Sequence, residues 1–211
     1  MIGKAASEIR RGFSGESAAG GLACEAMCAA LGADVAIVNQ TTVRGGFASG
    51  AVTRRDVYQC VPFQNELVAL TMTGAVLREL VEYVVGRGGD PNAEVAGLSV
   101  RYDPRRPRGE RVVEALVRGA AIDPARSYRL ATTDFYIERV DALAPIARVP
   151  SGMTPYDALV AYFVKRSPVA AAGGRRLVSL APAEPRSPRG QPRAVETTPT
   201  SAPAPAGEKR P

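Results

Sequence analysis

The chain has 211 residues, of which 45% are hydrophobic and 23% are charged, a composition typical of a globular domain with a sizeable core. It contains no histidine, which excludes a Ser-His-Asp or Cys-His catalytic arrangement and removes the ligand that most catalytic zinc sites use. Its three cysteines, Cys24, Cys28 and Cys60, are an odd number, so no disulfide framework is predicted, and buried apolar positions are the expected role.

The net charge of +6 comes partly from two basic runs, at 105–108 and in the last thirty residues. Neither run is interleaved with stacking aromatic residues, so a solvated turn and a soluble tail are favoured over nucleic-acid or membrane contacts. Residues 1–8 lack the apolar region of a signal peptide. The localisation stays open, since the chain is either cytoplasmic or lacks the residues that would export it.

Apolar periodicity and turn signals predict alternating helices and strands. In chain order these are a helix at 17–31, a strand at 34–39, a loop at 40–50, a short helix at 53–60, a strand at 66–73, a helix at 75–86, strands at 97–102, 111–118 and 127–133, and a helix at 154–165. Ser14 or Ser17 would cap the first helix, and Gly32 would end it. Thr154 would cap the last helix, with Pro155 in its first turn.

These elements predict a single α+β domain, in which helices pack on the faces of a mixed β-sheet. Residues 1–13 are expected to form a lead-in and residues 14–180 the folded domain. Residues 181–211 consist largely of Pro, Ala, Arg, Ser and Thr. Such a composition cannot bury enough apolar surface to offset its chain entropy, so we expect a disordered tail.

Six segments between about residues 14 and 141 each contain a short motif. They are Glu16–Met27, Gly32–Arg44, Gly50–Val68, Thr73–Leu77, Gly97–Val112 and Asp123–Phe135. Their order and spacing resemble the C-terminal domain of 5′-nucleotidases, with patterns such as E-[ST]-N-x-G-N-L-x-x-D-A-M, P-F-G-N-x-L-V and Y-R-V-A-T-x-[ND]-F. This family includes UDP-sugar hydrolases and 2′,3′-cyclic-nucleotide phosphodiesterases that act in nucleotide catabolism.

The resemblance implies a division of labour. In the full enzymes an N-terminal metallophosphoesterase domain holds two metal ions, while the C-terminal domain grips the nucleoside part of the substrate. No segment of this chain resembles the metal-binding half. The resemblance therefore implies no catalytic residue, no metal ligand and no cofactor in this chain, with the divalent metal ions belonging to the missing domain. Family members are mostly periplasmic or extracellular.

Two phenylalanines, Phe63 and Phe135, fall on the pair that sandwiches the nucleobase in the family. Two flat apolar faces can bind any base by stacking and desolvation. Without the motif context, core packing would be the favoured role of both rings. Phe63 follows Pro62 in a helix-to-strand connection, where a rigid turn can present a ring to a cleft.

Four polar residues complete the implied substrate site. Asn39 ends a strand and falls on an amide that binds the base edge, although a turn-forming role is the alternative. Asn65 lies in the same motif as Phe63. Arg44 falls on an arginine that binds ribose hydroxyls or phosphate in the family. The alternative is a solvated arginine in a loop. Asp141 stands six residues after Phe135, as does the family's ribose-binding aspartate.

The chain departs from the family pattern at three places. Gln40–Thr42 replaces three glycines, Glu138–Ala142 replaces a G-G-D-G-[YF] loop, and Ala18 and Gly21 stand where the family has asparagines. Glycines let a loop take positive φ and approach a ligand closely. The changes predict an altered ligand preference or a pocket no longer in use.

Three functions remain open at this stage. The chain is a component of a nucleotidase whose catalytic half lies elsewhere, for example on another polypeptide, or a stand-alone module that binds nucleotides or nucleotide sugars. The third is a degenerate interaction domain that keeps only the fold. Thiosulfate-handling relatives share the architecture, so a non-nucleotide substrate is also open.

Overall fold

The computed structural model describes residues 1–12, 16–86, 91–171 and 174–181. Its helices are α1 (Ala18–Leu31), α2 (Arg54–Cys60), α3 (Gly74–Val85), α4 (Asp134–Ile137) and α5 (Pro155–Arg166), with 3₁₀ turns η1 (Gln40–Thr42) and η2 (Asp141–Leu143). Its strands are β1 (Gly3–Ala5), β2 (Val35–Asn39), β3 (Gly50–Val52), β4 (Leu67–Thr73), β5 (Ala93–Ala96), β6 (Leu98–Tyr102), β7 (Val112–Val117), β8 (Ala120–Ala121), β9 (Ser127–Thr133), β10 (Arg148–Pro150) and β11 (Leu177–Ser179). Apart from Ala181, the tail predicted at 181–211 lies outside the described residues.

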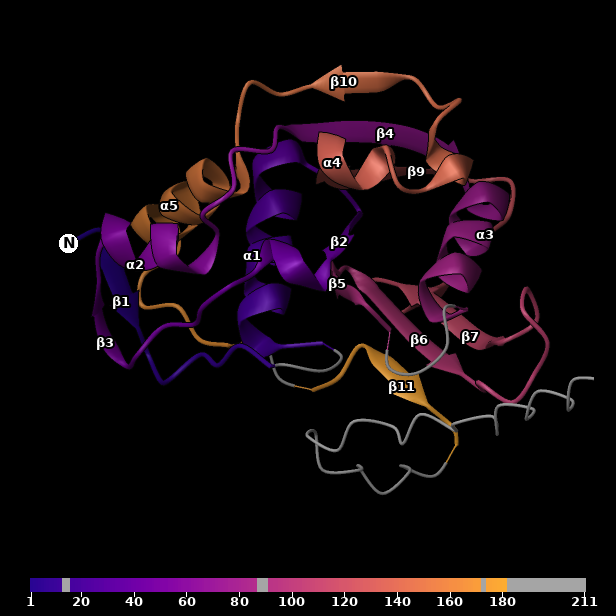
Figure 1. Cartoon of the computed structure of the whole chain (residues 1–211), viewed down its shortest axis with the longest axis horizontal. Coiled ribbons are helices and arrows are strands. Elements are labelled where there is room, and N and C mark those ends of the chain that lie inside the picture. The colour runs from indigo at the N-terminus through magenta and orange to yellow at the C-terminus, as the bar shows by residue number, and fades with distance from the viewer. Residues whose placement is uncertain (13–15, 87–90, 172–173, 182–211) are drawn as a thin grey trace, which may run out of the picture.

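A five-stranded sheet forms the centre of the fold, in the order β10-β4-β9-β2-β5. Strands β2 and β9 run parallel, and every other neighbouring pair in this sheet is antiparallel. In Figure 1, α1 lies between the group formed by α2, α5 and the β1–β3 pair and the group formed by α3 and β6–β7. The predicted α+β class with a mixed sheet and covering helices is confirmed.

Strand β2 shows how this sheet separates two cores. All of its first four side chains are apolar and buried, as a strand covered on both faces requires. Ala36 and Val38 pack with α1 and α5, whereas Val35 and Ile37 pack with α3 and the four-stranded sheet. The alternation follows from the two-residue period of a strand.

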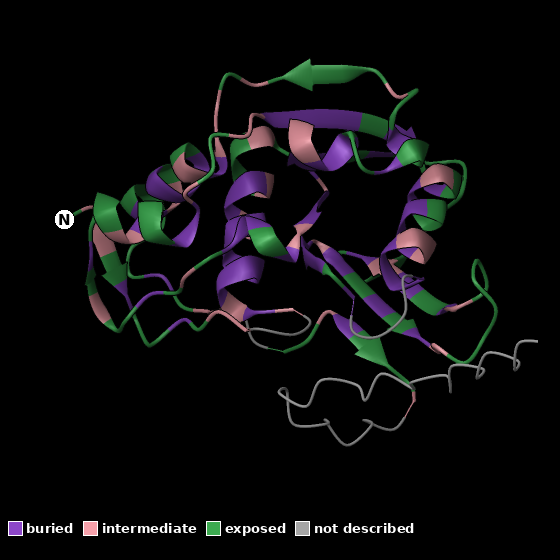
Figure 2. Ribbon diagram, in the orientation of Figure 1, coloured by how far each residue is buried: buried purple, intermediate pink, exposed green. Residues whose placement is uncertain are grey.

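The structure divides the strands among three sheets, where the sequence suggested a single one. A four-stranded sheet has the order β11-β6-β7-β8, and β1 pairs with β3 in a two-stranded sheet. Strands β10 and β11 are mostly exposed short edges, visible for β10 in Figure 2. The predicted strands at 97–102 and 111–118 correspond to β6 and β7, while 127–133 joins the central sheet as β9.

The ends of α1 follow the predicted signals. The Ser17 side chain accepts a hydrogen bond from the Gly20 N–H at 3.0 Å, which satisfies one free donor of the first turn. Gly32 takes the left-handed conformation at φ 59°, where a side chain is unfavourable. Ser14, the alternative cap, lies outside the described residues.

The first twelve residues pack against the domain. Strand β1 pairs with β3, and the Ile9 N–H donates to the Phe47 carbonyl at 2.8 Å. Ile9 is fully buried in the core that contains α1. The proposed boundary between residues 13 and 14 remains a prediction. Within the described ranges, no helix combines the length and apolarity needed to cross a membrane.

Candidate functional site

The candidate site lies at one end of the central sheet. Because β2 and β9 are parallel, their carboxyl ends meet at the same edge, which places Asn39 near the residues that follow Thr133. The pairing of Leu67 with Thr133 brings the start of β4 to this edge, and the pairing of Asn39 with Ala93 brings the start of β5. The strands β2, β4, β5 and β9 therefore each have one end at this edge, near the segments Gln40–Thr42 and Glu138–Ala142.

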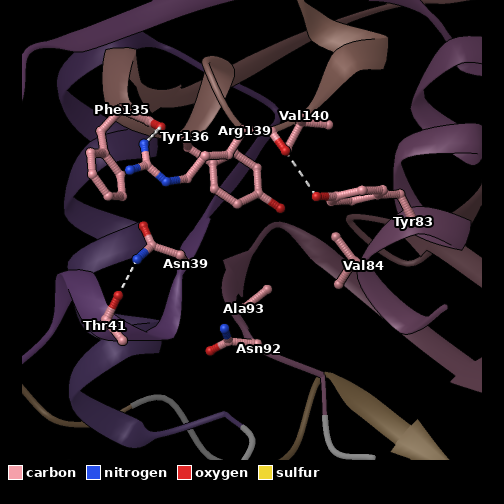
Figure 3. A pocket seen from close by; sticks show the side chains of 10 residues that line it. All are labelled: Asn39, Thr41, Tyr83, Val84, Asn92, Ala93, Phe135, Tyr136, Arg139 and Val140. Carbon is pink, nitrogen blue, oxygen red and sulfur yellow. Dashed lines mark hydrogen bonds between the residues drawn. The ribbon is translucent and has the colours of Figure 1, made fainter. Parts of the chain in front are cut away.

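A pocket of about 190 Å³ opens at this edge. Phe135 and three aliphatic residues supply its apolar wall, and six residues supply its polar groups, as Figure 3 shows. The polar six are Asn39, Thr41, Tyr83, Asn92, Tyr136 and Arg139. Such a mixture of one aromatic face and convergent amide, hydroxyl and cationic groups is suited to a small polar ligand with a flat apolar part.

Phe135 is partly buried in the short helix α4, and the Arg139 side chain covers its ring. The guanidinium carbon lies 3.5 Å from the ring centroid, and Nη1 donates to the Phe135 carbonyl at 3.1 Å. The Tyr83 hydroxyl donates to the Arg139 carbonyl at 2.9 Å, which ties the loop that follows α4 to α3 (Figure 3). Phe135 thus presents a ring to the pocket, but a cation of the same chain stacks on it.

Asn39 makes the turn contacts of the alternative role and also lines the pocket, while its contact with a base edge remains a prediction. Its Nδ2 donates to the Thr41 hydroxyl, and the Thr42 hydroxyl donates to its Oδ1 at 2.8 Å. These two bonds link the Asn39 side chain to the 3₁₀ turn η1, the segment that the resemblance sets against glycines. The same amide lines the pocket, so a ligand would meet a side chain already oriented by its own turn.

The other four candidate residues do not line this pocket. Phe63 is 43% exposed in the connection between α2 and β4, and Asn65 is half-buried in the same connection. Arg44 is exposed, with its N–H donating to the Cys60 carbonyl at 2.7 Å. Asp141 is exposed at the start of η2. The facing pair of rings and these three polar contacts remain predictions.

Sequence reasoning missed Tyr83, Asn92, Tyr136 and Arg139 as pocket residues. Tyr83 lies on α3 and Asn92 directly before β5, a strand that the sequence did not predict. Arg139 carried a usable signal, because it lies in Glu138–Ala142, the segment that the resemblance sets against a glycine-rich loop.

The described residues offer no ligand set for the metal ions that the resemblance implies. Within the described ranges, no group of three or more His, Cys, Asp or Glu residues is placed to hold a metal ion. Burial raises the pKa of the Cys28 and Cys60 thiols to about 12, so neither is a ready thiolate ligand. Cys24 and Cys60 are buried, as expected of small apolar residues.

Behind the pocket, on the opposite face of β5, lies a buried carboxyl group. Glu94 is fully buried, and it accepts hydrogen bonds from the Ser17 N–H at 2.9 Å and the Ser17 hydroxyl at 2.7 Å. Burial raises its pKa to about 7, although the two hydrogen bonds from Ser17 act in the opposite direction. Gly20 makes room for it, since a Cβ there would lie 1.9 Å from the Glu94 carboxyl carbon.

Solved structures show which class of fold this is. A 5′-nucleotidase precursor from Thermus thermophilus superposes with a TM-score of 0.74 at 24% identity, over 87% of this chain and 40% of that one. The sulfate thiohydrolase SoxB from Thermus thermophilus superposes with a TM-score of 0.69 at 22% identity, over 86% of this chain and 35% of that one. At these identities the likeness establishes the fold alone.

The family itself is established by the sequence. The profile of the family described as "5'-nucleotidase, C-terminal domain" matches residues 1–145, and the chain belongs to this family. Endonuclease YhcR of Bacillus subtilis is 28% identical over 137 residues, 64% of this chain, and protein UshA of Yersinia enterocolitica is 31% identical over 144 residues, 65% of this chain. The chain spans 11% and 25% of the lengths of these two relatives, respectively.

Proposed function

We propose that this chain is the nucleoside- or nucleotide-recognising domain of a 5′-nucleotidase-type phosphoester hydrolase. The observation that carries the proposal is the pocket at the end of β2 and β9, which both the ring of Phe135 and the amide of Asn39 line in a domain of this family. An aromatic face binds a base by stacking, and an amide both donates to and accepts from a base edge.

In this role the chain binds and positions its ligand and does not itself cleave a phosphoester bond. It contains no histidine, and the metal ions of the family find no ligand set in its described ranges. The metallophosphoesterase half would be supplied by another polypeptide or by sequence beyond these residues. Holding the substrate in a fixed orientation contributes to rate even when the chemistry belongs to another domain.

Calorimetric titration with adenosine, uridine, AMP and UMP tests the proposal directly. We expect the wild-type chain to bind at least one of the four, and Phe135→Ala to weaken that binding by about 1–3 kcal/mol, the usual contribution of one base–aromatic stack. Tyr162→Ala is a matched control, because the Tyr162 ring also lies beneath an arginine, Arg166 at 5.2 Å, but does not line this pocket. Equal losses in both variants would contradict the proposal.

The second candidate is a stand-alone binding or interaction domain that no longer serves a hydrolase. The contact of Arg139 with Phe135 favours it, since that contact covers a surface the family uses for its ligand. A degenerate interaction domain predicts that Phe63→Ala and Arg44→Ala change neither ligand binding nor partner choice. A loss of nucleotide affinity in either variant favours the recognition domain.

A further inference from the structure

Arg139 covers one face of the Phe135 ring, and the inference drawn from this contact rests on the proposed function. The Arg139 guanidinium lies 3.5 Å from the ring centroid, which is van der Waals contact. A nucleobase inserted between the two groups would need about 3.5 Å on each of its faces. The present separation leaves no room for it, so a base can stack on this face of Phe135 only after the arginine has moved.

The contacts of Arg139 allow such a movement without disturbing the backbone. The loop is tied through its main chain, because the Tyr83 hydroxyl donates to the Arg139 carbonyl and the Arg139 N–H donates to the Tyr136 carbonyl at 3.1 Å. The side chain itself contacts the Phe135 ring, the Phe135 carbonyl and Glu138, and it is 52% exposed. The guanidinium can therefore leave the ring by rotation of its own side chain.

The charge around Arg139 indicates what would draw it away. Among the described residues that line the pocket, none is an aspartate or a glutamate. The carboxylate oxygen of Glu138 lies 4.0 Å from the Arg139 Nη1, and that side chain is 67% exposed, so water screens the pair. A phosphate offers this guanidinium two parallel charge-assisted hydrogen bonds, a stronger partner than an aromatic face.

We propose that Arg139 is a specificity-determining residue, which competes with uncharged nucleosides for the face of Phe135 and yields it to nucleosides that carry an acidic group. A ligand with a phosphate pairs with the displaced guanidinium. A ligand without a phosphate breaks the contact between Arg139 and Phe135 and offers the guanidinium no new partner. The pocket therefore discriminates in favour of nucleotides over nucleosides. The Arg139 side chain, in the segment that the resemblance sets against a glycine-rich loop, is the source of this preference.

The test compares adenosine with AMP and uridine with UMP by calorimetry on the full chain and on Arg139→Ala. In the variant we expect nucleoside affinity to rise by about three- to tenfold, because the competing cation is gone. AMP and UMP should bind no tighter than to the wild type, so the preference for the nucleotide collapses. Arg139→Lys keeps the charge and should retain a preference for the nucleotide.

Arg166→Ala is the matched control, since Arg166 also stacks on an aromatic ring but lies on α5 outside this pocket. It should leave all four affinities unchanged. If Arg139→Ala binds nucleosides no better than the wild type while some probe binds both proteins, this inference fails and the proposed function stands. If no probe binds either folded protein, the proposed function fails and the inference fails with it.

Discussion

Neighbouring residues of β5 face two regions of opposite character. Ala93 lines the pocket, whereas Glu94 points to the other face of the sheet and meets the start of α1. On the α1 side the Glu94 carboxyl group accepts both of its hydrogen bonds from Ser17, which is itself buried. On the pocket side every polar residue except the buried Tyr136 is partly or fully exposed, and the contact that covers Phe135 comes from a half-exposed arginine.

Both regions contain a position at which the resemblance predicts a departure from the family pattern, and in both an arginine side chain occupies the space beside it. Near α1, the Arg176 guanidinium lies where a side chain at Gly21 would begin, and it pairs with Glu25. At the pocket, Arg139 lies on Phe135. Near α1 the arginine is held by a partly buried ion pair, whereas at the open pocket Arg139 makes a contact that a ligand can replace.

Removal of the buried carboxyl group should have the largest effect. Glu94→Ala leaves the Ser17 N–H without its acceptor and opens a cavity, so we expect the free energy of unfolding at pH 6 to fall by about 3–4 kcal/mol. Glu66→Ala is the control, because the Glu66 Oε1 also accepts a backbone N–H, from Gly152 at 2.8 Å, but is partly exposed to water. Urea denaturation should show a loss below about 1 kcal/mol there. Equal losses would contradict the contrast between the two regions.

The pH dependence of stability should be the next largest effect. Burial, reinforced by the charge of Glu16, raises the pKa of Glu94 from 4.5 to about 7, while the Ser17 hydrogen bonds and the charge of Arg11 oppose the shift. Between these two pKa values the folded protein holds a proton that the unfolded chain releases. Stability should therefore be greatest below pH 4.5 as far as this group is concerned, and should fall by up to about 3 kcal/mol as the pH rises to about 7.

Denaturation series at pH 5 and pH 7.5 measure this slope. Glu94→Gln should remove most of it, because the amide does not titrate in this range. The half-buried Glu16, whose pKa burial also raises, contributes a residual slope of the same sign. A slope that Glu94→Gln leaves unchanged would mean that another group is responsible.

The helices α1, α2, α3 and α5 and the long strands could be predicted because their signals are local, whereas the four-residue helix α4 was not predicted. The apolar period of α3 and the β-branched run of β2 are visible in a window of a few residues. The short strands could not be predicted, because their pairing is set by distant partners. Gly3 pairs with Val52 and Arg148 pairs with Leu70, and a segment of three residues is too short to show a pattern of its own.

The candidate site was predicted in part, for the same reason. Asn39 and Phe135 were found because motifs at the ends of two strands named them, and the parallel pairing of β2 and β9 brings them to one pocket. Tyr83 and Asn92 come from elements whose adjacency is a tertiary property. The stack of Arg139 on Phe135 depends on the conformation of one flexible side chain, which a sequence pattern does not encode.

Restoration of the family asparagine near α1 should have a moderate effect. In Gly21→Asn the new Cβ would lie 2.1 Å from the Arg176 Nη1, so the arginine must leave its pair with Glu25, and we expect a loss of about 2 kcal/mol in unfolding free energy. Gly32→Asn is the control, since Gly32 has open space around it and asparagine tolerates its left-handed conformation.

A double-mutant cycle measures the coupling between positions 21 and 176. When Arg176→Ala is combined with Gly21→Asn, the loss should be smaller than the sum of the two single losses by about 1 kcal/mol, because the clash has been removed. Strict additivity of the two substitutions would show that they are independent, and the ion pair of Arg176 would not be what Gly21→Asn disturbs.

The smallest effect is expected at the hydrogen bond that holds the Arg139 segment to α3 on the pocket side. Tyr83→Phe removes the hydroxyl that donates to the Arg139 carbonyl, so the unfolding free energy should fall by about 1 kcal/mol, the net value of one hydrogen bond. Tyr58→Phe, on the exposed surface of α2, should change it by less. Because the Tyr83 bond holds the main chain of the loop and not the guanidinium, the preference for AMP over adenosine should survive in Tyr83→Phe. A loss of that preference, measured by the same calorimetry, would show that the position of the loop and not the Arg139 side chain sets the selectivity.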